Sequence, residues 1–312
     1  MSIIVVGGGL IGSAVAFTLR DAGLEVEVLD AHLPGAGWRA AAGLLTPDGE
    51  RLAGTPLHAS ALESLNLWPE FARSLEAHSG QSVHLRTGVF RLGPVPEVGE
   101  GPHGLTRCTP GEGRLHPASV VSAALTGVRV TRARVLALRP DRRGVSLQTD
   151  AGDRGGRLVV LATGAWSSAF GLDIRPVQGQ ALLLEGGNDH PAVYGTRRRG
   201  HGPHGYALGR PDGLYVGATA RLSASVQPDS WARRWLQGAA RTLAPTCSGH
   251  AVLSQLVGLR PVTPDGLPLV GPHPTLPGVV VATGHGRHGA LLAPLTARQV
   301  LALVRQALPE AA

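Results

Sequence analysis

The sequence predicts an α/β fold in which a parallel β-sheet is covered by helices. Near the start of the chain, a β-branched run from Ile3 to Val6 predicts a buried strand, and a small-residue helix is expected from Leu10 to Ala22. The segment "GLEVEVLD" then predicts a second strand that ends at Asp30. Strand, helix and strand in this order form a βαβ unit, which implies parallel strands in one sheet. The end of the chain carries a similar pattern, because "VVVATGHGRHGALLAP" predicts a buried strand from Val279, a glycine-rich loop and the start of a helix.

Between these ends the sequence predicts further helices and strands. Helical spacing is found from Ala61 to His78, in "HPASVVSAAL" and from Ser230 to Leu243, and the last helix is expected from Gly289 to Leu308. The pattern is strand-like from Val128 to Leu161, and "GYALGRPDGLYVGAT" has a Pro-Asp-Gly turn between two apolar runs, which predicts a hairpin. The segment from Gly93 to Gly113 is interpreted as a loop or hairpin connection, and "GLRPVTPDGLPLVG" as an irregular stretch.

Composition limits the classes of function. The 312 residues suffice for one large domain or two smaller ones, and the net charge is +7. All basic residues are Arg, however, and the densest run, Arg197-Arg198-Arg199, is too short to indicate a nucleic-acid-binding tail. The aromatic content of 4% also argues against a base-stacking surface, so no nucleic acid partner is expected.

The same composition bears on the compartment. The two cysteines, Cys108 and Cys247, lie too far apart for a metal-binding spacing or a disulfide framework, so a cytoplasmic location is expected. The first nineteen residues carry no charge, but they lack a positive n-region and glycines interrupt the apolar run. We therefore expect neither a signal peptide nor a membrane span.

A glycine motif follows the first predicted strand. Gly7, Gly9 and Gly12 form GxGxxG, in which the first glycine permits the turn, the second lets a pyrophosphate approach the backbone, and the third lets helix and strand pack closely. The helix N-terminus supplies free amides to the phosphates, and Asp30 is the acid expected to bind a ribose. The alternative is a packing turn with a solvated Asp. The motif favours a dinucleotide, and taken alone it suits NAD and FAD equally.

The second glycine loop holds His285, Arg287 and His288, which leaves a metal site, a phosphate cradle and a substrate clamp as alternatives. A metal is disfavoured because the two histidines have no third ligand at a recognisable spacing. The sequence therefore predicts no metal site.

Six segments in order resemble one family. They are "VVGGGLIGSAVAFTL", "AAAGLLTP", "VVLATGAWS", "RPVQGQ", "GLRPVTPDGLPLVG" and "ATGHGRHGALLAP". Together they resemble the FAD-dependent glycine oxidases of the D-amino-acid oxidase superfamily, nearly end to end. The poorest match, from Leu92 to His116, looks shortened. The resemblance implies a discontinuous Rossmann-like FAD-binding domain of residues 1–57, 116–172 and 258–312. It also implies an α+β substrate domain with an antiparallel sheet, of residues 58–115 and 173–257.

The resemblance also implies FAD bound noncovalently, because no Cys stands in the C-terminal loop. Implied flavin contacts lie in the first glycine loop, after the second strand, in the Ala-Gly loop, in the central sheet and in the C-terminal loop. They are Gly7, Gly9, Leu10, Ile11, Gly12, Asp30, Ala31, Ala42, Gly43, Leu44, Val135, Gly164, His285, Gly286, Arg287, His288, Gly289, Ala290 and Leu291. Asp30 replaces the more usual Glu of the family. The second helix N-terminus is expected beside the flavin ring, where its partial positive charge would stabilise the negative charge that reduction develops.

Three residues match the substrate side of the family. Arg260 stands where the substrate carboxylate is bound, which suits the paired donors of a guanidinium, and Tyr206 matches a tyrosine that hydrogen-bonds the same carboxylate. Arg287 matches an arginine near flavin and substrate. The alternatives are a surface salt bridge for Arg260 and strand packing for Tyr206. Ala220 stands where the family often has Met, so a wider substrate pocket is expected.

The implied reaction is oxidation of glycine, sarcosine or a small D-amino acid to the 2-oxo acid, with release of ammonia or amine and hydrogen peroxide. A hydride passes from the substrate to the flavin, dioxygen is the acceptor, and no general base is required. The family often supplies thiamine thiazole synthesis, and a homo-oligomer is compatible with the sequence. The alternatives are a D-amino-acid dehydrogenase that uses a quinone or another acceptor, and a non-catalytic flavin-binding or basic binding protein.

Overall fold

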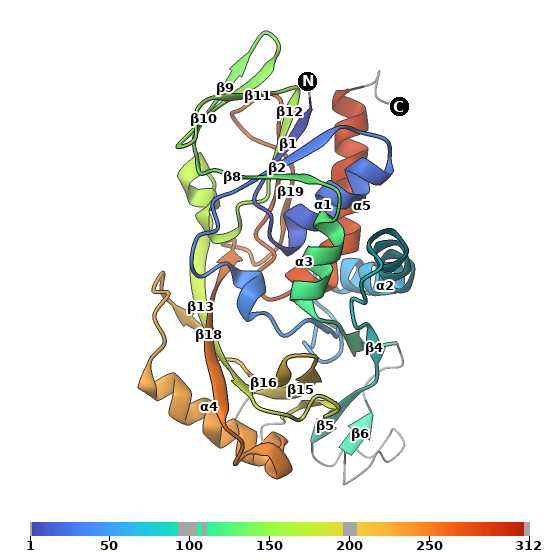
Figure 1. The fold of residues 1–312 in the computed structure, drawn as a ribbon, viewed down its shortest axis with the longest axis vertical. Helices are drawn as coiled ribbons and strands as arrows, with labels where there is room; N and C mark the ends of the chain where they lie inside the picture. Colours follow the sequence, from blue (N-terminus) through green and yellow to red (C-terminus); the bar gives the residue numbers. More distant parts are fainter. Residues whose placement is uncertain (1, 93–104, 108–110, 196–204, 309–312) are drawn as a thin grey trace.

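The computed structural model of the chain describes residues 2–92, 105–107, 111–195 and 205–308. A six-stranded sheet occupies the upper half of the molecule in Figure 1, and both ends of the chain contribute to it. In spatial order its strands are β19 (Leu269–Pro272), β20 (Val279–Thr283), β12 (Leu158–Leu161), β1 (Ile3–Val6), β2 (Val26–Asp30) and β8 (Arg129–Arg132). All neighbours run parallel except β19, which is antiparallel to β20. The predicted parallel sheet is confirmed.

The two faces of this sheet are covered differently because side chains alternate along a strand. Ile3 and Val5 of β1 join the core formed by the helices, whereas Ile4 and Val6 pack against a small antiparallel sheet. The helices are α1 (Leu10–Asp21), α2 (His58–Ser79), α3 (Pro117–Leu125) and α5 (Gly289–Ala307). The small sheet consists of β9 (Val135–Asp141), β10 (Gly144–Thr149) and β11 (Arg154–Gly156).

A second, mostly antiparallel sheet of eight strands fills the lower half of Figure 1. Its strands are β5 (Val89–Leu92), β6 (Leu105–Arg107), β13 (Arg175–Leu184), β14 (Ala192–Tyr194), β15 (Tyr206–Arg210), β16 (Gly213–Gly217), β17 (Arg221–Leu222) and β18 (Val252–Val262). The amphipathic helix α4 (Ser230–Leu243) packs its apolar face on this sheet through Leu236 and Leu243. The α/β class with an antiparallel second sheet is confirmed.

Short elements connect the two sheets. A three-stranded sheet contains β3 (Leu44–Leu45), β7 (Gly113–Arg114) and β4 (Arg86–Thr87). The 3₁₀ helices of the described residues include η1 (Gly37–Ala40), η3 (Gly164–Phe170) and η4 (Pro245–Cys247). The two long strands β13 and β18 run side by side in Figure 1. They pair from Arg175 with Val262 to Leu184 with Val252.

One predicted element is wrong. The segment "GLRPVTPDGLPLVG" was expected to be irregular, but residues Gly258 to Val262 continue the long strand β18. Proline is tolerated there because β18 lies at the edge of the sheet, with β13 as its neighbouring strand, and Pro261 is opposite Pro176.

The division into two domains at the predicted residues stays a prediction. Helix α2, placed by that division in the substrate domain, buries Trp68 and Leu75 in the same core as Val5. Cys108, the run Arg197-Arg198-Arg199 and most of the segment from Leu92 to His116 lie outside the described residues.

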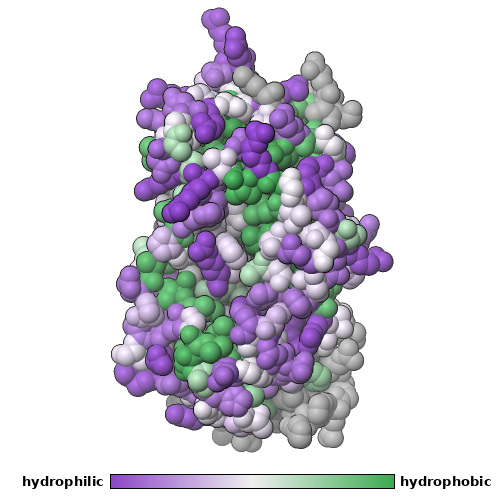
Figure 2. Space-filling model, in the orientation of Figure 1, coloured by the Kyte–Doolittle hydropathy of each residue, from purple (hydrophilic) through white to green (hydrophobic). Residues whose placement is uncertain are grey.

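Hydrophilic residues dominate the face shown in Figure 2, and apolar residues gather there in smaller areas. Large apolar side chains that are exposed include Leu222, Trp231 and Leu253. Among the described residues, no helix is both long enough and apolar enough to span a membrane.

Candidate active site

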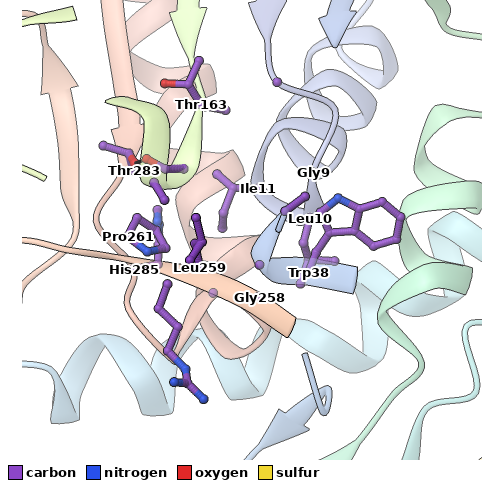
Figure 3. Close-up of a pocket in the computed structure, with 18 of the residues that line it drawn as sticks. Gly9, Leu10, Ile11, Trp38, Thr163, Gly258, Leu259, Pro261, Thr283 and His285 are labelled. Atoms are coloured by element: carbon purple, nitrogen blue, oxygen red, sulfur yellow. Dashed lines mark hydrogen bonds between the residues drawn. The ribbon is translucent and has the colours of Figure 1, made fainter. Parts of the chain in front are cut away.

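A cavity of about 330 Å³ lies at the carboxyl ends of β1, β2 and β12 and extends to β18. This is the edge of a parallel sheet where doubly wound folds bind their ligands. Figure 3 shows Gly9, Leu10 and Trp38 on one side of the cavity and Thr163, Thr283 and His285 on the other. Except for Gly12 and Ala220, all of the predicted flavin and substrate residues line this cavity.

The first glycine loop has no space for side chains. Gly7 has a φ of +103°, and a Cβ there would overlap the carbonyl oxygen of Ala162. A Cβ at Gly12 would overlap the carbonyl oxygen of Gly7, so Gly12 serves helix–strand packing instead of lining the cavity. Helix α1 begins after Gly9 and has no acidic residue in its first turn. The loop therefore presents free amides and a partial positive charge to a ligand.

Asp30 closes this end of the cavity. Its Oδ2 accepts a hydrogen bond from the amide of Gly8 (2.5 Å), and its Oδ1 accepts one from the amide of His32 (2.6 Å). Both oxygens retain acceptor capacity, because a carboxylate oxygen accepts more than one hydrogen bond. The side chain is thus held at the end of β2 in a position suited to ribose hydroxyls.

The C-terminal glycine loop bends between β20 and α5. Gly284 and Gly286 have positive φ angles of +77° and +54°, and the amide of Gly286 donates to the carbonyl oxygen of Pro261 (2.8 Å). This hydrogen bond joins the loop to β18. Helix α5 begins at Gly289 without an acidic residue in its first turn, so a second helix N-terminus with partial positive charge faces the cavity.

His285 is a neutral, structural member of this loop. It is 3% exposed, and its Nε2 lies 2.9 Å from Oγ1 of Thr296. Burial, with a smaller contribution from His288, lowers the pKa of His285 to about 3. The described residues contain no cluster of three potential metal-binding side chains.

A hydroxyl cluster supports the middle of the cavity. Thr163 Oγ1 lies 2.9 Å from Ser167 Oγ, which in turn donates to Thr283 Oγ1 (2.9 Å). Thr283 also donates to the carbonyl oxygen of Gly164 (3.2 Å). This cluster links the end of β12 to the end of β20. Only Gly164 of this group was predicted, because the hydroxyls meet across 116 residues of sequence.

Arg260 extends from β18 into the cavity, and its guanidinium lies against the backbone of Gly179 on β13. A Cβ at Gly179 would come within 2.5 Å of the guanidinium carbon and both terminal nitrogens. Nη1 of Arg260 donates to the carbonyl oxygen of Thr219 (3.0 Å). In the described part of the chain, no carboxylate forms an ion pair with Arg260. The guanidinium therefore retains donors for an external anion.

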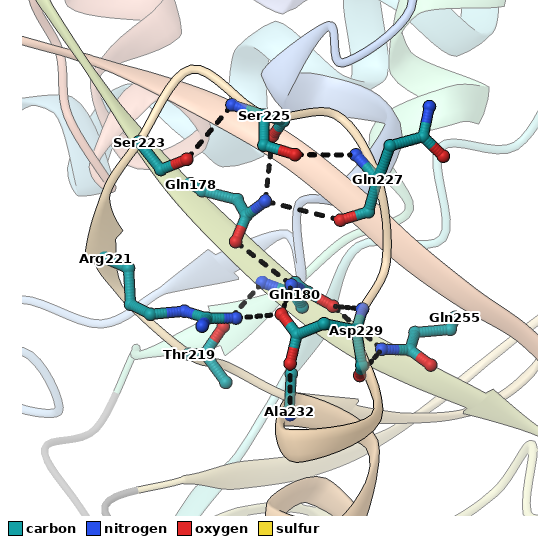
Figure 4. A network of polar contacts seen from close by, with 10 residues as sticks. All are labelled: Gln178, Gln180, Thr219, Arg221, Ser223, Ser225, Gln227, Asp229, Ala232 and Gln255. Carbon is teal, nitrogen blue, oxygen red and sulfur yellow. Dashed lines mark hydrogen bonds and ion pairs between the residues drawn. The ribbon is translucent and has the colours of Figure 1, made fainter.

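A buried polar network holds Thr219, the partner of Arg260 (Figure 4). The amide of Gln180 donates to Thr219 Oγ1 (2.9 Å), and the amide of Thr219 donates back to the carbonyl oxygen of Gln180 (3.0 Å). The Gln180 side chain donates to Asp229 (2.6 Å) and accepts from Gln255 (2.8 Å). Asp229 also pairs with Arg221. The pattern "VQGQ" contains the glutamines, but their partners are distant in sequence.

The expectation for Ala220 is wrong. Ala220 is exposed and does not line the cavity. The neighbouring Thr219 takes the inward position, 5% exposed, because its hydroxyl and its amide bind Gln180. A small residue at position 220 therefore does not widen this cavity.

Arg287 has a partner that the sequence did not reveal. Its Nε lies 2.7 Å from Oε2 of Glu50, and its Nη2 donates to Oε1 (3.2 Å). Glu50 also accepts from the hydroxyl of Tyr194 (2.8 Å), which lies 2.8 Å from Thr46 Oγ1. Burial opposes the charge of Arg287, but Glu50 raises the pKa of the guanidinium. Arg260, in contrast, has no carboxylate partner among the described residues.

Tyr206 lies between two other tyrosines. Its ring stacks on that of Tyr215 at 6.1 Å and is tilted against that of Tyr194 at 5.5 Å. The hydroxyl of Tyr215 is fixed by the carbonyl oxygen of Ala40 (2.8 Å). Tyr206 is both packed in the sheet and part of the cavity wall, and its hydrogen bond to a substrate carboxylate stays a prediction.

The residues of the cavity fit FAD. Because the first glycine loop lacks side chains, a diphosphate can approach its backbone. Asp30 is suited to bind a ribose, and Trp38 packs its apolar ring against Gly9. Val135, on β9, is 8% exposed and supplies apolar lining at the other end of the same region. The N-termini of α1 and α5 add partial positive charge, which favours an anionic dinucleotide in this site.

Comparisons with known proteins agree with this geometry. The family described as "FAD dependent oxidoreductase" matches residues 2–100 and 94–303. The glycine oxidase of Geobacillus kaustophilus is 29% identical, covering 97% of this chain and 93% of that protein. The crystal structure of a glycine oxidase from the same organism superposes with a TM-score of 0.84 at 26% identity, covering 98% of this chain and 94% of that chain.

A second kind of relative is longer. The bifunctional protein ThiO/ThiG of Synechocystis is 30% identical over 343 residues, which cover 97% of this chain and 51% of that protein. The chain thus spans about half the length of the bifunctional relatives it matches.

Proposed function

The chain belongs to the family of FAD-dependent oxidoreductases, and we propose that it oxidises glycine and other small amino acids, sarcosine and D-amino acids included. The products are the 2-oxo acid, ammonia or amine, and hydrogen peroxide. One observation carries the proposal: Arg260, without a carboxylate partner among the described residues, lies in the same cavity as the two glycine loops. A free guanidinium beside a flavin site is suited to a substrate carboxylate.

The proposed cofactor contacts follow from the cavity. The amides of the Gly7–Leu10 loop would hold the pyrophosphate, Asp30 the ribose, and Val135 the adenine side. The start of α5 would lie beside the flavin ring. We propose noncovalent binding, because none of the residues that line the cavity is cysteine and Cys247 belongs to the core under α4.

Binding and orientation are the proposed work of the protein. Arg260 would pair with the carboxylate through two parallel donors, and Tyr206, from the same sheet, would add a hydrogen bond. Holding the carboxylate fixes the α-carbon relative to the flavin, which converts a bimolecular encounter into an oriented one. The Glu50–Arg287 pair would limit the far side of the substrate pocket.

The chemistry requires little from side-chain acids and bases. Bound FAD would supply the two-electron acceptor for the α C–H bond, with dioxygen as final acceptor. His285 stays neutral through burial and bonds to Thr296, so it is placed as support for the loop and not as a proton carrier.

We also propose that the reaction supplies the synthesis of the thiamine thiazole. The support is the match to bifunctional proteins named ThiO/ThiG, over about half of their length.

The direct test is peroxide release by the purified FAD-loaded protein. We expect peroxide from glycine, sarcosine or a small D-amino acid in air. Turnover seen only with a quinone or dye acceptor would favour the dehydrogenase alternative. Colourless protein that releases no FAD on denaturation would contradict both and favour the non-catalytic binding protein.

A substitution tests the role of Arg260. Arg260→Ala is expected to raise the KM for glycine strongly while bound FAD stays stoichiometric, because the side chain is assigned to the substrate and not to the cofactor. The matched control is Arg233→Ala, an exposed arginine on α4. Loss of FAD, or unchanged glycine kinetics, would show that Arg260 has another role.

A further inference from the structure

A second cavity, of about 110 Å³, lies apart from the first and shares no lining residue with it. It is enclosed by β4, β7, the start of α3 and the turn between β15 and β16. Five of its lining residues have basic side chains: His84, Arg86, Arg114, His116 and Arg210. None of these was assigned a role by the family resemblance.

Arg114 is the most buried of the three arginines that line the cavity, and among the described residues its charge is favoured only at a distance, by Asp189. It is 6% exposed, and its Nε and Nη2 donate to the carbonyl oxygens of Gly209 (3.2 Å) and His190 (3.1 Å). Arg114 forms no ion pair within the part of the chain that the structure describes. Burying a charge in this way is costly unless another group neutralises it.

Three carboxylates act on the basic groups of the cavity, and all are already engaged. Glu76, near His84, accepts hydrogen bonds from Ser82 Oγ and the amide of Val83. Asp212 pairs with Arg210 (2.6 Å) and lies 3.7 Å from Nε2 of His116. Asp189 pairs with Arg86 (3.3 Å), but it is 97% exposed, so solvent weakens that pair. Positive charge therefore remains around Arg114.

The electrostatics of the histidines agree. Burial lowers the pKa of His84, and the nearby His116 and Arg86 lower it further, although Glu76 acts in the opposite direction. The rings of His84 and His116 are 6.2 Å apart. Each basic group thus makes a second positive charge nearby less favourable.

The N-terminus of a helix lies beside this cavity, which is lined by His116, the residue before the helix. Helix α3 starts at Pro117 after His116, with no side-chain hydrogen bond at its cap and no acidic residue in its first turn. Its partial positive charge adds to that of the arginines. The cavity with its five basic side chains and the burial of Arg114 without an ion pair among the described residues are two independent observations.

We propose that this second cavity binds a small tetrahedral oxyanion of the phosphate class. Its volume is below the range typical of cofactor and drug-sized sites, which leaves room for a single phosphate group but not a nucleotide. Guanidinium forks and imidazoles are the groups that recognise phosphate. The ion would link α3, which packs in the core beside the six-stranded sheet, to the β15–β16 hairpin of the eight-stranded sheet.

The test is calorimetric titration of FAD-loaded protein with inorganic phosphate, at constant ionic strength balanced with chloride. FAD occupies the first glycine loop, so phosphate cannot bind there. We expect saturable binding of one phosphate per chain. Arg86→Gln, on a half-exposed side chain, should weaken that binding about tenfold or more by removing a charged hydrogen bond. Arg114→Gln should weaken phosphate binding further. If Arg114→Gln fails to fold, Arg86→Gln alone still tests the proposal.

Arg233→Gln is the matched control and should bind phosphate as the unmodified protein does. Glycerol phosphate forms the second arm: binding of both ligands supports a site open to phosphate monoesters, and binding of inorganic phosphate alone supports a site for the free ion. The proposal is overturned if no saturable binding occurs, if Arg86→Gln binds unchanged, or if Arg233→Gln weakens binding equally. Peroxide release from glycine is not a readout here, so failure of this proposal leaves the proposed function standing.

Discussion

Gly179→Ala is the substitution that most sharply tests how Arg260 is held. The guanidinium of Arg260 lies on the backbone of Gly179, and an added methyl group would come within 2.5 Å of its carbon and terminal nitrogens. Because Gly179 is in the middle of β13, paired with Gly258, its backbone has little freedom to retreat. The guanidinium must therefore move, and its hydrogen bond to Thr219 must lengthen or break.

The magnitude follows from the contacts that depend on this position. A hydrogen bond to a charged group is worth about 1.5–3 kcal/mol, which corresponds to about a 10- to 150-fold loss of kcat/KM for glycine. We expect most of the loss in KM, since Arg260 is assigned to substrate binding in ground state and transition state alike. The assay is steady-state peroxide production across glycine concentrations, with FAD content measured in the same preparation.

Gly271→Ala is the control for this experiment. Gly271 lies in β19, and a Cβ there would meet nothing within 4 Å, so its kinetics should match those of the unmodified protein. The reasoning is refuted if Gly179→Ala retains full kcat/KM, or if it loses FAD while Arg260→Ala retains it.

Three further predictions concern cofactor binding and stability. Gly12→Ala should lose FAD, because the new Cβ overlaps the carbonyl oxygen of Gly7 and pushes α1 away from β1; flavin fluorescence per chain after gel filtration measures this, and full retention would contradict it. Burial raises the pKa of Glu112 from 4.5 to about 7, so between these pH values the folded chain holds a proton that the unfolded chain has lost. The free energy of unfolding should then fall by about 3 kcal/mol as pH rises through this range, and urea titrations of Glu112→Gln should lack that slope. For His285 the pH dependence of the free energy of unfolding has the opposite sign. Its pKa is lowered from 6.5 to about 3 in the folded chain, so as pH falls the unfolded chain binds a proton at a higher pH than the folded chain does. The free energy of unfolding should therefore fall by about 2 kcal/mol as pH falls from 6.5 to 5. The same pH dependence in His285→Asn would contradict the assignment of this effect to His285.

The elements with strong local signals could be predicted from the sequence. The helix from Ser230 to Leu243 has the predicted bounds, because its apolar spacing is regular. The βαβ unit up to Asp30 is also confirmed, since β-branched strands and a glycine turn mark it. In contrast, the strand at Gly258 to Val262 was missed, because prolines indicate irregular backbone and only edge position makes them tolerable.

The contacts that complete the site could not be predicted in this way. Arg287 and Glu50 meet across 237 residues, and nothing local to either residue signals the pair. Gly179 looks like an ordinary strand glycine until Arg260 is seen to lie on it. Such pairings depend on which strands become neighbours, here β13 and β18, and this register is not encoded in any single segment.

The most direct test of the whole account is anaerobic addition of glycine, sarcosine or a small D-amino acid to the purified, FAD-loaded protein. The account predicts that one of these substrates bleaches the visible absorbance of the flavin, and that Arg260→Ala with equal FAD content requires far more substrate for the same bleaching. Persistent flavin absorbance with every one of these substrates, or bleaching that Arg260→Ala leaves unaltered, would contradict it.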